Sequence, residues 1–341
     1  MMLLHRTIDA SVHPADAESR CPDLLAAWLR HAPDSRADAG ADFEDWAEPA
    51  HVLASMERHG AVVPLGAGPT VRYTGDNTPL VPAREGSPKA IMWGRFLPTD
   101  SSHFPLDVDL AWNAAPHVRR VQDYPTSPVF LGRVGRDFHV CDMTDSSVSR
   151  AMVALREAGR ATGFVKTRDK GSTNLFDVPT EGDSRLYMSL DLPDPYLFAI
   201  REGDRACLFV QQAIRPTREY RLFVVGDQVV TGAGCIIEHT PCDNEGLAFD
   251  DRVEIIRYQG AVVRDADVVA RYVAFAREYA LAWAAEHGSD MGYALDLCID
   301  ADSDTIQIVE MNPLANIGLY AIDTDLLVDA MVGHAPGEIR A

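Results

Sequence analysis

The strongest constraint on the fold is a pair of apolar segments near the C-terminus, GYALDLCID (292–300) and TIQIVEMNP (305–313). Their apolar and β-branched residues predict two strands, and the ADSD between them predicts a tight antiparallel hairpin. With the turn centred in ADSD, Asp296 lies opposite Glu310, and Asn312 shares the face of Glu310 because side chains alternate along a strand. Three oxygen-bearing side chains therefore converge on one face of an otherwise apolar hairpin.

These three side chains are compatible with a metal site and with an ordinary half-exposed hairpin. Taken alone, they favour neither interpretation. Two adjacent carboxylates among apolar neighbours repel each other and lose hydration, which is costly unless a cation sits between them. Oxygen-only donors favour Mg²⁺, which prefers a few carboxylates plus phosphate oxygens. The following NPLANIGLY favours the metal site, since Pro313 ends the strand and Asn316 and Gly318 shape a loop there.

A second signal is the distribution of lysine. Only three of the 31 basic residues are lysines, and two of these, Lys166 and Lys170, stand in GFVKTRDKGST (163–173). A strand ending in Lys and followed by a Gly/Ser/Thr turn offers an ammonium, backbone N–H groups and hydroxyls to phosphate oxygens. The spacing is not that of a P-loop. The alternative is a solvated hairpin turn, which the scarcity of lysine elsewhere makes weaker.

The spacing of apolar residues predicts the other helices and strands. We interpret 61–126 as short strands and loops, and SPVFLGRV (127–134) as a strand. Asp145 or Ser146 is expected to cap a helix that Gly159 ends. Further elements are predicted as helices over 21–32, 43–60, 144–159 and 265–288, a strand over 206–214, and a hairpin over 219–236 around Gly226.

Size and composition exclude several classes of protein. A chain of 341 residues is expected to form two or three domains. A net charge of −20, spread along the chain, argues against binding of nucleic acid and against docking on an anionic membrane. The six cysteines form no CxxC pair, so we expect buried free thiols in a reducing cytoplasm rather than a zinc site or disulfide framework. Neither a signal peptide nor a membrane span is expected.

The strand lysine, the later hairpin and the Asp…Glu-x-Asn group together resemble the ATP-grasp superfamily. EYRLFVVGDQVV is similar to the acidic-x-Arg-x-x-Val-Val-Gly hairpin of RimK-like glutamate ligases. VEMNPLANIGLY is similar to the closing motif of the ATP-grasp clade named for an arginine and two lysines. The resemblance covers about 145–322, just over half of the chain, and its motifs occur in the family's order.

The resemblance implies an α+β ATP-grasp fold, in which two α+β subdomains sandwich ATP, preceded by an N-terminal α/β pre-ATP-grasp-type domain. The first 140 residues match no motif, so they are expected to form a variable domain that selects the substrate. The implied division is 1–140 for this N-terminal domain, 141–218 for the small lid subdomain, and 219–341 for the large subdomain with the metal site.

The same resemblance implies roles for single residues. Lys166 matches the lysine that contacts the α- and β-phosphates, and Arg221 matches the arginine that points toward the γ-phosphate and acyl group. Glu219 matches the acidic residue that binds ribose hydroxyls or supports the hinge. The other implied sites are phosphate contacts at Lys170, Ser172 and Thr173, adenine contacts at Gln212, Ala213 and Ile214, and Mg²⁺ ligands at Asp296, Glu310 and Asn312.

One position departs from the family pattern. D-alanine–D-alanine ligases carry an arginine two residues before the metal Asp, and here that position is Ala294. The RimK-like group lacks this arginine too, so Arg221 is expected to take its role. Arg257 in VEIIRY is a further catalytic candidate, with a surface strand residue as the alternative. Tyr320 and Asn316 either line the substrate end of the site or cap the loop.

The activity implied is an ATP-dependent ligase that forms a C–N bond between a carboxylate and an amine through an acylphosphate, releasing ADP and phosphate. The cofactors would be ATP and Mg²⁺, which Mn²⁺ can replace, and the substrates a small molecule, amino acid or peptide. The 170–185 loop is a candidate lid, and a homodimer is left open. The alternatives are an ATP-binding assembly or chaperone factor without ligase activity, and a phosphotransferase on the same fold.

Overall fold

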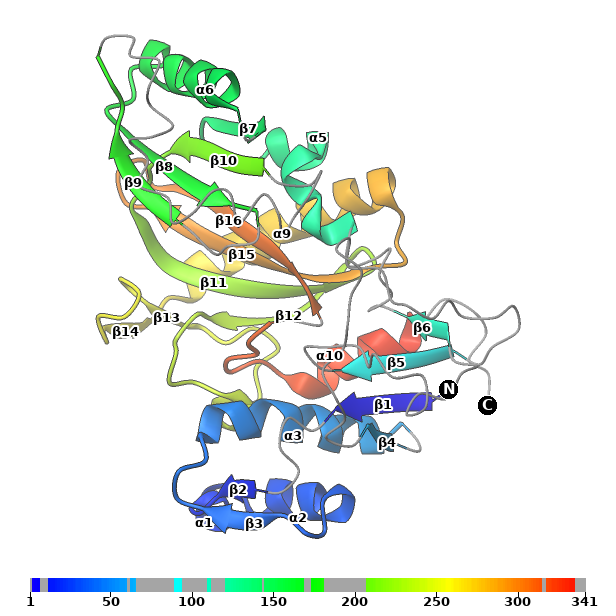
Figure 1. The fold of residues 1–341 in the computed structure, drawn as a ribbon. Coiled ribbons are helices and arrows are strands. Elements are labelled where there is room, and N and C mark those ends of the chain that lie inside the picture. The colour runs from blue at the N-terminus through cyan, green and yellow to red at the C-terminus, as the bar shows by residue number, and fades with distance from the viewer. Residues whose placement is uncertain are drawn as a thin grey trace. The chain divides into compact units, whose positions relative to one another are not determined.

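The chain combines helices with parallel and antiparallel sheets, as expected for an α+β protein (Figure 1). It divides into two compact units, each described by itself: Met1–Asp123, Thr217–Cys298 and Ile308–Ala341 form unit 1, and Tyr124–Pro216 and Ile299–Gln307 form unit 2. The division into 1–140, 141–218 and 219–341 stays a prediction. The computed structural model describes residues 2–6, 12–59, 62–65, 89–93, 109–111, 120–142, 144–168, 173–180, 207–314 and 317–334.

The N-terminal part of unit 1 contains a four-stranded parallel sheet of order β4-β1-β5-β6. The central strand β1 (Met2–Arg6) pairs with β4 (Val62–Leu65) and β5 (Lys89–Trp93), and β5 pairs with β6 (Asp109–Ala111). Parallel pairing needs crossover connections, which is the hallmark of α/β structure. The short strands expected within 61–126 are thus present as β4, β5 and β6.

Helices accompany this sheet where the periodicity predicts them. The 21–32 pattern forms α2 (Pro22–His31), and the 43–60 pattern forms α3 (Phe43–Glu57). Asp42 caps α3 by accepting a hydrogen bond from the backbone N–H of Glu44 at 2.9 Å. The two helices bury Trp28 edge-on against Trp46, with ring centroids 6.1 Å apart. Beside them lie α1 (Ala17–Arg20) and the parallel pair of β2 (Val12–Pro14) and β3 (Arg36–Asp38).

A four-stranded sheet of order β12-β11-β15-β16 follows in the C-terminal half. The predicted 219–236 hairpin is confirmed as β11 (Pro216–Val225) and β12 (Gln228–Gly234). Gly226 occupies the turn with φ +65°, a backbone conformation that glycine adopts without steric cost. The C-terminal hairpin is confirmed as β15 (Gly292–Asp300) and β16 (Thr305–Pro313).

One face of this sheet is covered by α9 (Ala266–His287), the helix predicted over 265–288. Tyr220 of β11 stacks on Tyr272 of the helix at 5.7 Å, and the Tyr279 hydroxyl donates to Met311 Sδ of β16 at 3.0 Å. Because side chains alternate, the residues flanking Tyr220 and Met311 project from the opposite face. Neither α9 nor any other described helix has the length and apolar character needed to cross a membrane.

That opposite face is partly covered by an apolar cluster, and the remainder carries polar side chains. Phe223, Val225 and Ala294 contribute from the sheet. The helices over them are α3 and α10 (Thr324–Gly333), which contribute Val52, Met56, Leu327, Val328 and Met331. The polar side chains on this face, among them Arg221 and Asp296, therefore border a buried core.

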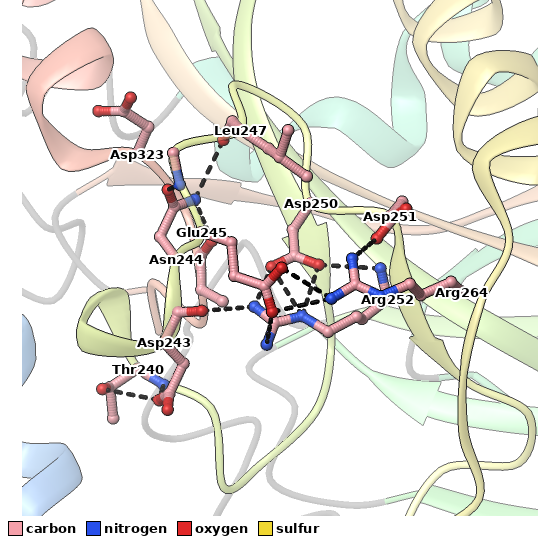
Figure 2. A network of polar contacts seen from close by, with 12 residues as sticks. Thr240, Asp243, Asn244, Glu245, Leu247, Asp250, Asp251, Arg252, Arg264 and Asp323 are labelled. Carbon is pink, nitrogen blue, oxygen red and sulfur yellow. Dashed lines mark hydrogen bonds and ion pairs between the residues drawn. The ribbon is translucent and has the colours of Figure 1, made fainter.

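The loop after β12 is fixed by a polar network, shown in Figure 2. Thr240 and Asp243 form a capping box around the short 3₁₀ helix η4 (Pro241–Asp243). The Arg252 side chain pairs with the Asp250 carboxylate, and its Nη2 donates to the Asp243 carbonyl at 2.6 Å. The strands that follow are β13 (Arg252–Glu254) and β14 (Val262–Arg264).

Unit 2 is built on an antiparallel sheet of order β7-β10-β8-β9, with α6 (Asp145–Glu157) over one face (Figure 1). Val165, Leu208 and Val210 of the sheet pack against the helix in one apolar cluster. The four strands are β7 (Phe138–Asp142), β10 (Cys207–Gln212), β8 (Thr162–Thr167) and β9 (Thr173–Asp177).

Two local predictions in this unit are wrong. Residues 127–134 do not form a strand: after the 3₁₀ turn η2 (Tyr124–Thr126) the chain forms the one-turn helix α5 (Pro128–Leu131). Ser127 Oγ accepts from the Val129 N–H at 3.2 Å, and Pro128 occupies the first helical position. These two residues start a helical turn, although the apolar run that follows is also compatible with a strand.

The cap of α6 is Thr144, whose Oγ1 accepts from the Ser147 N–H at 3.4 Å, rather than Asp145 or Ser146. Threonine has the same capping chemistry, so the prediction missed by one residue. Gly159 follows the helix with φ +72° and ends it as expected.

Candidate functional site

A polar group in unit 1 extends across three neighbouring strands of the β12-β11-β15-β16 sheet. Glu219 and Arg221 lie two residues apart on β11, and Asp296 lies on the adjacent strand β15. Glu310 and Asn312 lie two residues apart on β16. Residues two apart on a strand share a face, so these five side chains project from the face opposite α9.

Arg221 and Asp296 form a bidentate ion pair at the centre of this group. Arg221 Nε donates to Asp296 Oδ1 and Nη2 donates to Oδ2, both at 2.7 Å. Asp296 is 1% exposed and Arg221 is 8% exposed, so the pair is almost fully shielded from water. Burial lowers the pKa of Arg221, but the charge of Asp296 and its hydrogen bonds raise it. The net result is a pKa well above the ordinary arginine value. The guanidinium therefore remains charged.

A second ion pair lies alongside and is linked to the first by Tyr320. Arg257 Nη1 donates to Glu219 Oε1 at 3.0 Å, and its Nη2 donates to the Tyr320 hydroxyl at 3.3 Å. The Tyr320 ring faces the Arg221 guanidinium at 5.3 Å, a cation–π distance. Arg257 is thus part of the polar group rather than an isolated surface residue, and Tyr320 connects the two arginines.

The carboxylates of the group interact electrostatically with one another. Burial raises the pKa of Glu219, Arg257 lowers it, and the carboxylates of Asp296 and Glu310 raise it again. These contributions place the three carboxylates within electrostatic reach of one another.

The expected metal ligands Asp296, Glu310 and Asn312 carry oxygen atoms, which are the donors suited to a hard cation. Asn312 Nδ2 donates to Glu310 Oε1 at 2.9 Å and to Asp296 Oδ2 at 3.3 Å, so the three side chains meet as the hairpin predicted. Carboxylate and amide oxygens are the donors that Mg²⁺ prefers. However, both Asp296 oxygens are held by Arg221, and the described residues include no group of three or more His, Cys, Asp or Glu arranged around a metal position. The ligand set stays a prediction.

Glu48 belongs to the same neighbourhood, although no sequence motif indicates it. Its Oε1 accepts the backbone N–H groups of Leu319 and Tyr320, in the loop whose Gly318 carbonyl accepts from Arg221 Nη1 at 3.0 Å. Burial raises the pKa of Glu48 to about 7. The sequence offers one sign that Glu48 is buried. It is an acidic residue between Ala47 and Pro49, and α3 buries both of these neighbours.

The strand lysine of unit 2 lies on the sheet face that α6 leaves uncovered. Its neighbour Val165 packs into the α6 cluster, so alternation directs Lys166 to the other face. In the strand register Lys166 is opposite Phe209 on one side and Thr173 on the other. Lys166 and Thr173 are therefore adjacent. The remaining predicted residues of this turn and of the C-terminal loop lie outside the described residues: Lys170, Ser172 and Asn316.

The expected adenine-binding segment lies at the end of β10. The Gln212 N–H donates to the Asp137 carbonyl at 2.9 Å, and the Ala213 N–H donates to the Thr162 carbonyl at 3.2 Å. These amides hold the strand end in place. The role of the segment stays a prediction.

Comparisons with known proteins find solved structures that are similar in fold. No family model matches the chain, and no curated protein matches it in sequence. The structure of a D-cycloserine synthetase superposes with a TM-score of 0.50 at 14% identity, covering 98% of this chain and 99% of that one. A D-alanyl-alanine synthetase A from Vibrio cholerae gives 0.50 at 11% identity, covering 98% of each chain. At such identities the likeness is one of fold, and it extends over nearly the whole length.

Proposed function

We propose, from the premise that this chain has the ATP-grasp fold, that it is an ATP-dependent ligase that joins a carboxylate to an amine through an acylphosphate. An amino acid or peptide is the expected class of substrate. The D-alanyl-alanine synthetase of the same fold makes a dipeptide by name, which supports the proposal. A cytoplasmic location and a homodimer remain predictions.

The observation that carries the proposal is the buried Arg221–Asp296 pair beside two further carboxylates. A guanidinium has five N–H groups, and the contacts within the described residues use three of those of Arg221. The other two can donate to the oxygens of a transferred phosphoryl group. A buried, fixed guanidinium stabilises developing negative charge without reorganising during the reaction.

In the proposed reaction a substrate carboxylate attacks the γ-phosphorus of ATP, which breaks the bond to the bridging oxygen of the β-phosphate, releases ADP and forms the acylphosphate. An amine then attacks the acyl carbon, displaces phosphate and loses a proton as the amide forms. Lys166 and Thr173 would hold phosphate oxygens, and Arg221 would orient the acyl group and neutralise its charge. Glu310, Asn312 and Asp296 would hold Mg²⁺, which supplies charge neutralisation at the phosphates. The group would act by positioning and electrostatics, with no covalent enzyme intermediate.

The test is ADP formation by the full-length protein with ATP and Mg²⁺ across a panel of amino acids and short peptides. We expect ADP that depends on a particular substrate pair. Lys166→Ala and Glu310→Ala should lower that rate by at least about a hundredfold, since the lysine would neutralise phosphate oxygens directly and the glutamate would hold the Mg²⁺ that does so. Asp302→Asn is the matched control, because Asp302 is an exposed carboxylate at the turn of the same hairpin.

The outcomes separate the competing functions. An ATP-binding assembly or chaperone factor would bind ATP but form no substrate-dependent ADP anywhere in the panel. A phosphotransferase would form ADP together with a stable phosphorylated product and no amide bond. Either result would overturn the ligase proposal, and full activity in both the lysine and glutamate variants would overturn the site assignment.

A further inference from the structure

A pocket of about 740 Å³ lies in unit 1, away from the polar group on the three strands. Its walls come from the junction of α1 and α2, from α3, and from η4. Three arginines and three acidic side chains line it, so it presents no net charge to a ligand. These are Arg20, Arg30, Arg58, Asp23, Glu57 and Asp325.

Two cysteines, Cys21 and Cys242, also line this pocket, and their sulfur atoms lie 2.7 Å apart although the residues are 221 positions apart in the chain. Both are free thiols and both are partly exposed. The chain's other cysteines are buried within the two units, at Cys141, Cys207, Cys235 and Cys298. Of the six cysteines, Cys21 and Cys242 are therefore the two whose thiols are partly exposed.

Both backbones are held by regular structure. The Cys21 N–H donates to the Ala17 carbonyl at 2.9 Å, and the Cys21 carbonyl accepts from the Leu25 N–H at 3.0 Å, so Cys21 belongs to the junction of two helices. The Cys242 N–H donates to Thr240 Oγ1 at 3.2 Å, inside the capping box of Figure 2. The two sulfurs therefore meet without rearrangement of the chain.

The geometry fits a covalent bond better than a shared metal. Two thiolates on one tetrahedral zinc, with Zn–S bonds of about 2.3 Å, would be about 3.8 Å apart. A disulfide of about 2.05 Å needs the sulfurs to approach by only about 0.7 Å from their present separation. His51 Nε2 lies 3.2 Å from Cys242 Sγ, and burial lowers the pKa of His51 to about 4, so a neutral imidazole faces the thiol.

We propose that Cys21 and Cys242 form a reversible disulfide in this pocket, by exchange with a low-molecular-weight disulfide that the pocket admits. The bond would join the α1–α2 junction to the loop after β12. This inference is independent of the ligase proposal. It also departs from the expectation, drawn from the spacing of cysteines alone, that all six would be buried free thiols.

The reaction is two successive exchanges. The Cys21 thiol loses its proton and attacks one sulfur of the small disulfide, which forms a mixed disulfide and releases one small thiol. The Cys242 thiol then loses its proton and attacks the Cys21 sulfur, which releases the second small thiol. The two protein thiols are oxidised and the small disulfide is reduced to two thiols, so electrons and protons balance.

The second exchange requires the Cys242 thiol to lose its proton. Burial, followed by the neighbouring Cys21 thiol, raises the pKa of Cys242 to about 12. Because the thiolate is the attacking species, formation of the bond should accelerate as pH rises above neutrality.

The experiment treats the full-length protein with bis(2-hydroxyethyl) disulfide, an uncharged probe, then alkylates it under denaturing conditions and maps its peptides. We expect a linked peptide containing Cys21 and Cys242, with four of the six cysteines alkylated. Dithiothreitol should restore alkylation of all six. The oxidised protein should also melt at a higher temperature, because the cross-link reduces the freedom of the unfolded chain.

Cys21→Ser and Cys242→Ser should each abolish the linked peptide, and Cys207→Ser in β10 is the matched control that should retain it. The wild-type map is decisive even if a variant folds poorly. A mixed disulfide that persists on Cys21 with no link to Cys242, or alkylation of both residues after treatment, would overturn the proposal. Protection of both thiols by added Zn²⁺ without a bond between them would also overturn it and identify a metal site instead.

Discussion

At the scale of single residues, breaking the Arg221–Asp296 pair should strongly destabilise the protein, because removing one partner leaves a buried, uncompensated charge. Arg221→Ala is expected to lower the free energy of unfolding by about 3–5 kcal/mol. Urea unfolding followed by circular dichroism measures this change. The double variant Arg221→Met/Asp296→Leu should recover much of the loss, since neither charge then remains buried. An unchanged urea midpoint in Arg221→Ala would show that the pair is not buried as described.

Glu48 should make stability depend on pH. Its pKa in the folded protein is about 7, above the ordinary value of 4.5, so the folded state retains a proton that the unfolded state releases. The stabilising contribution of Glu48 is therefore complete below about pH 4.5 and is lost as pH rises toward 7. Glu48→Gln keeps an acceptor for the Leu319 and Tyr320 N–H groups without the ionisation.

The measurement is the melting temperature of the wild type and of Glu48→Gln between pH 4.5 and 8. The variant is expected to gain on the wild type as pH rises, by about 2–4 °C at pH 8. Glu157→Gln, at the exposed end of α6, is the control and should show no such trend. A constant difference between Glu48→Gln and the wild type across this range would contradict the raised pKa.

At the scale of elements, the contact between β12 and β13 depends on Gly234. A Cβ at this position would lie 2.4 Å from the Arg252 carbonyl oxygen and 3.2 Å from Val253 Cα, both of which are backbone atoms. Gly234→Ala should therefore destabilise the protein by about 1–3 kcal/mol, because the strands must separate. Chemical denaturation measures the effect.

Gly333→Ala is the matched control for this substitution. Gly333 lies at the end of α10, and a Cβ there would meet nothing within 4 Å. Its replacement should be neutral or slightly stabilising, since alanine favours a helix. Equal effects of the two substitutions would mean that β13 does not pack on β12 as closely as described.

At the scale of the whole molecule, binding of ATP with Mg²⁺ should stabilise the folded chain by mass action. At ATP about a hundred times above its Kd the gain is about 2.7 kcal/mol, which appears as a rise in melting temperature. Differential scanning fluorimetry with and without ATP measures it. Lys166→Ala should lose most of the rise, whereas Asp302→Asn should retain it. A full rise in Lys166→Ala would exclude this lysine from the phosphate site.

Local pattern predicted much of the fold. The 3.6-residue period located α2, α3, α6 and α9, and alternation located the hairpins of β11–β12 and β15–β16. It failed at 127–134, where a Ser-Pro start produced a helical turn within an apolar run. A short apolar run is compatible with either structure, and the cap and the surrounding packing decide between them.

Of the candidate site, the sequence by itself determined the members that lie on one hairpin or two residues apart on one strand, because strand geometry alone places them together: Glu219 with Arg221, and Asp296 with Glu310 and Asn312. Only the tertiary structure decided that Tyr320 links Arg221 to Arg257, that Glu48 reaches the same loop, and that Cys21 meets Cys242. These contacts join segments far apart in the chain. Burial of apolar faces on separate elements brings such segments together, and no local period encodes which polar side chains then meet.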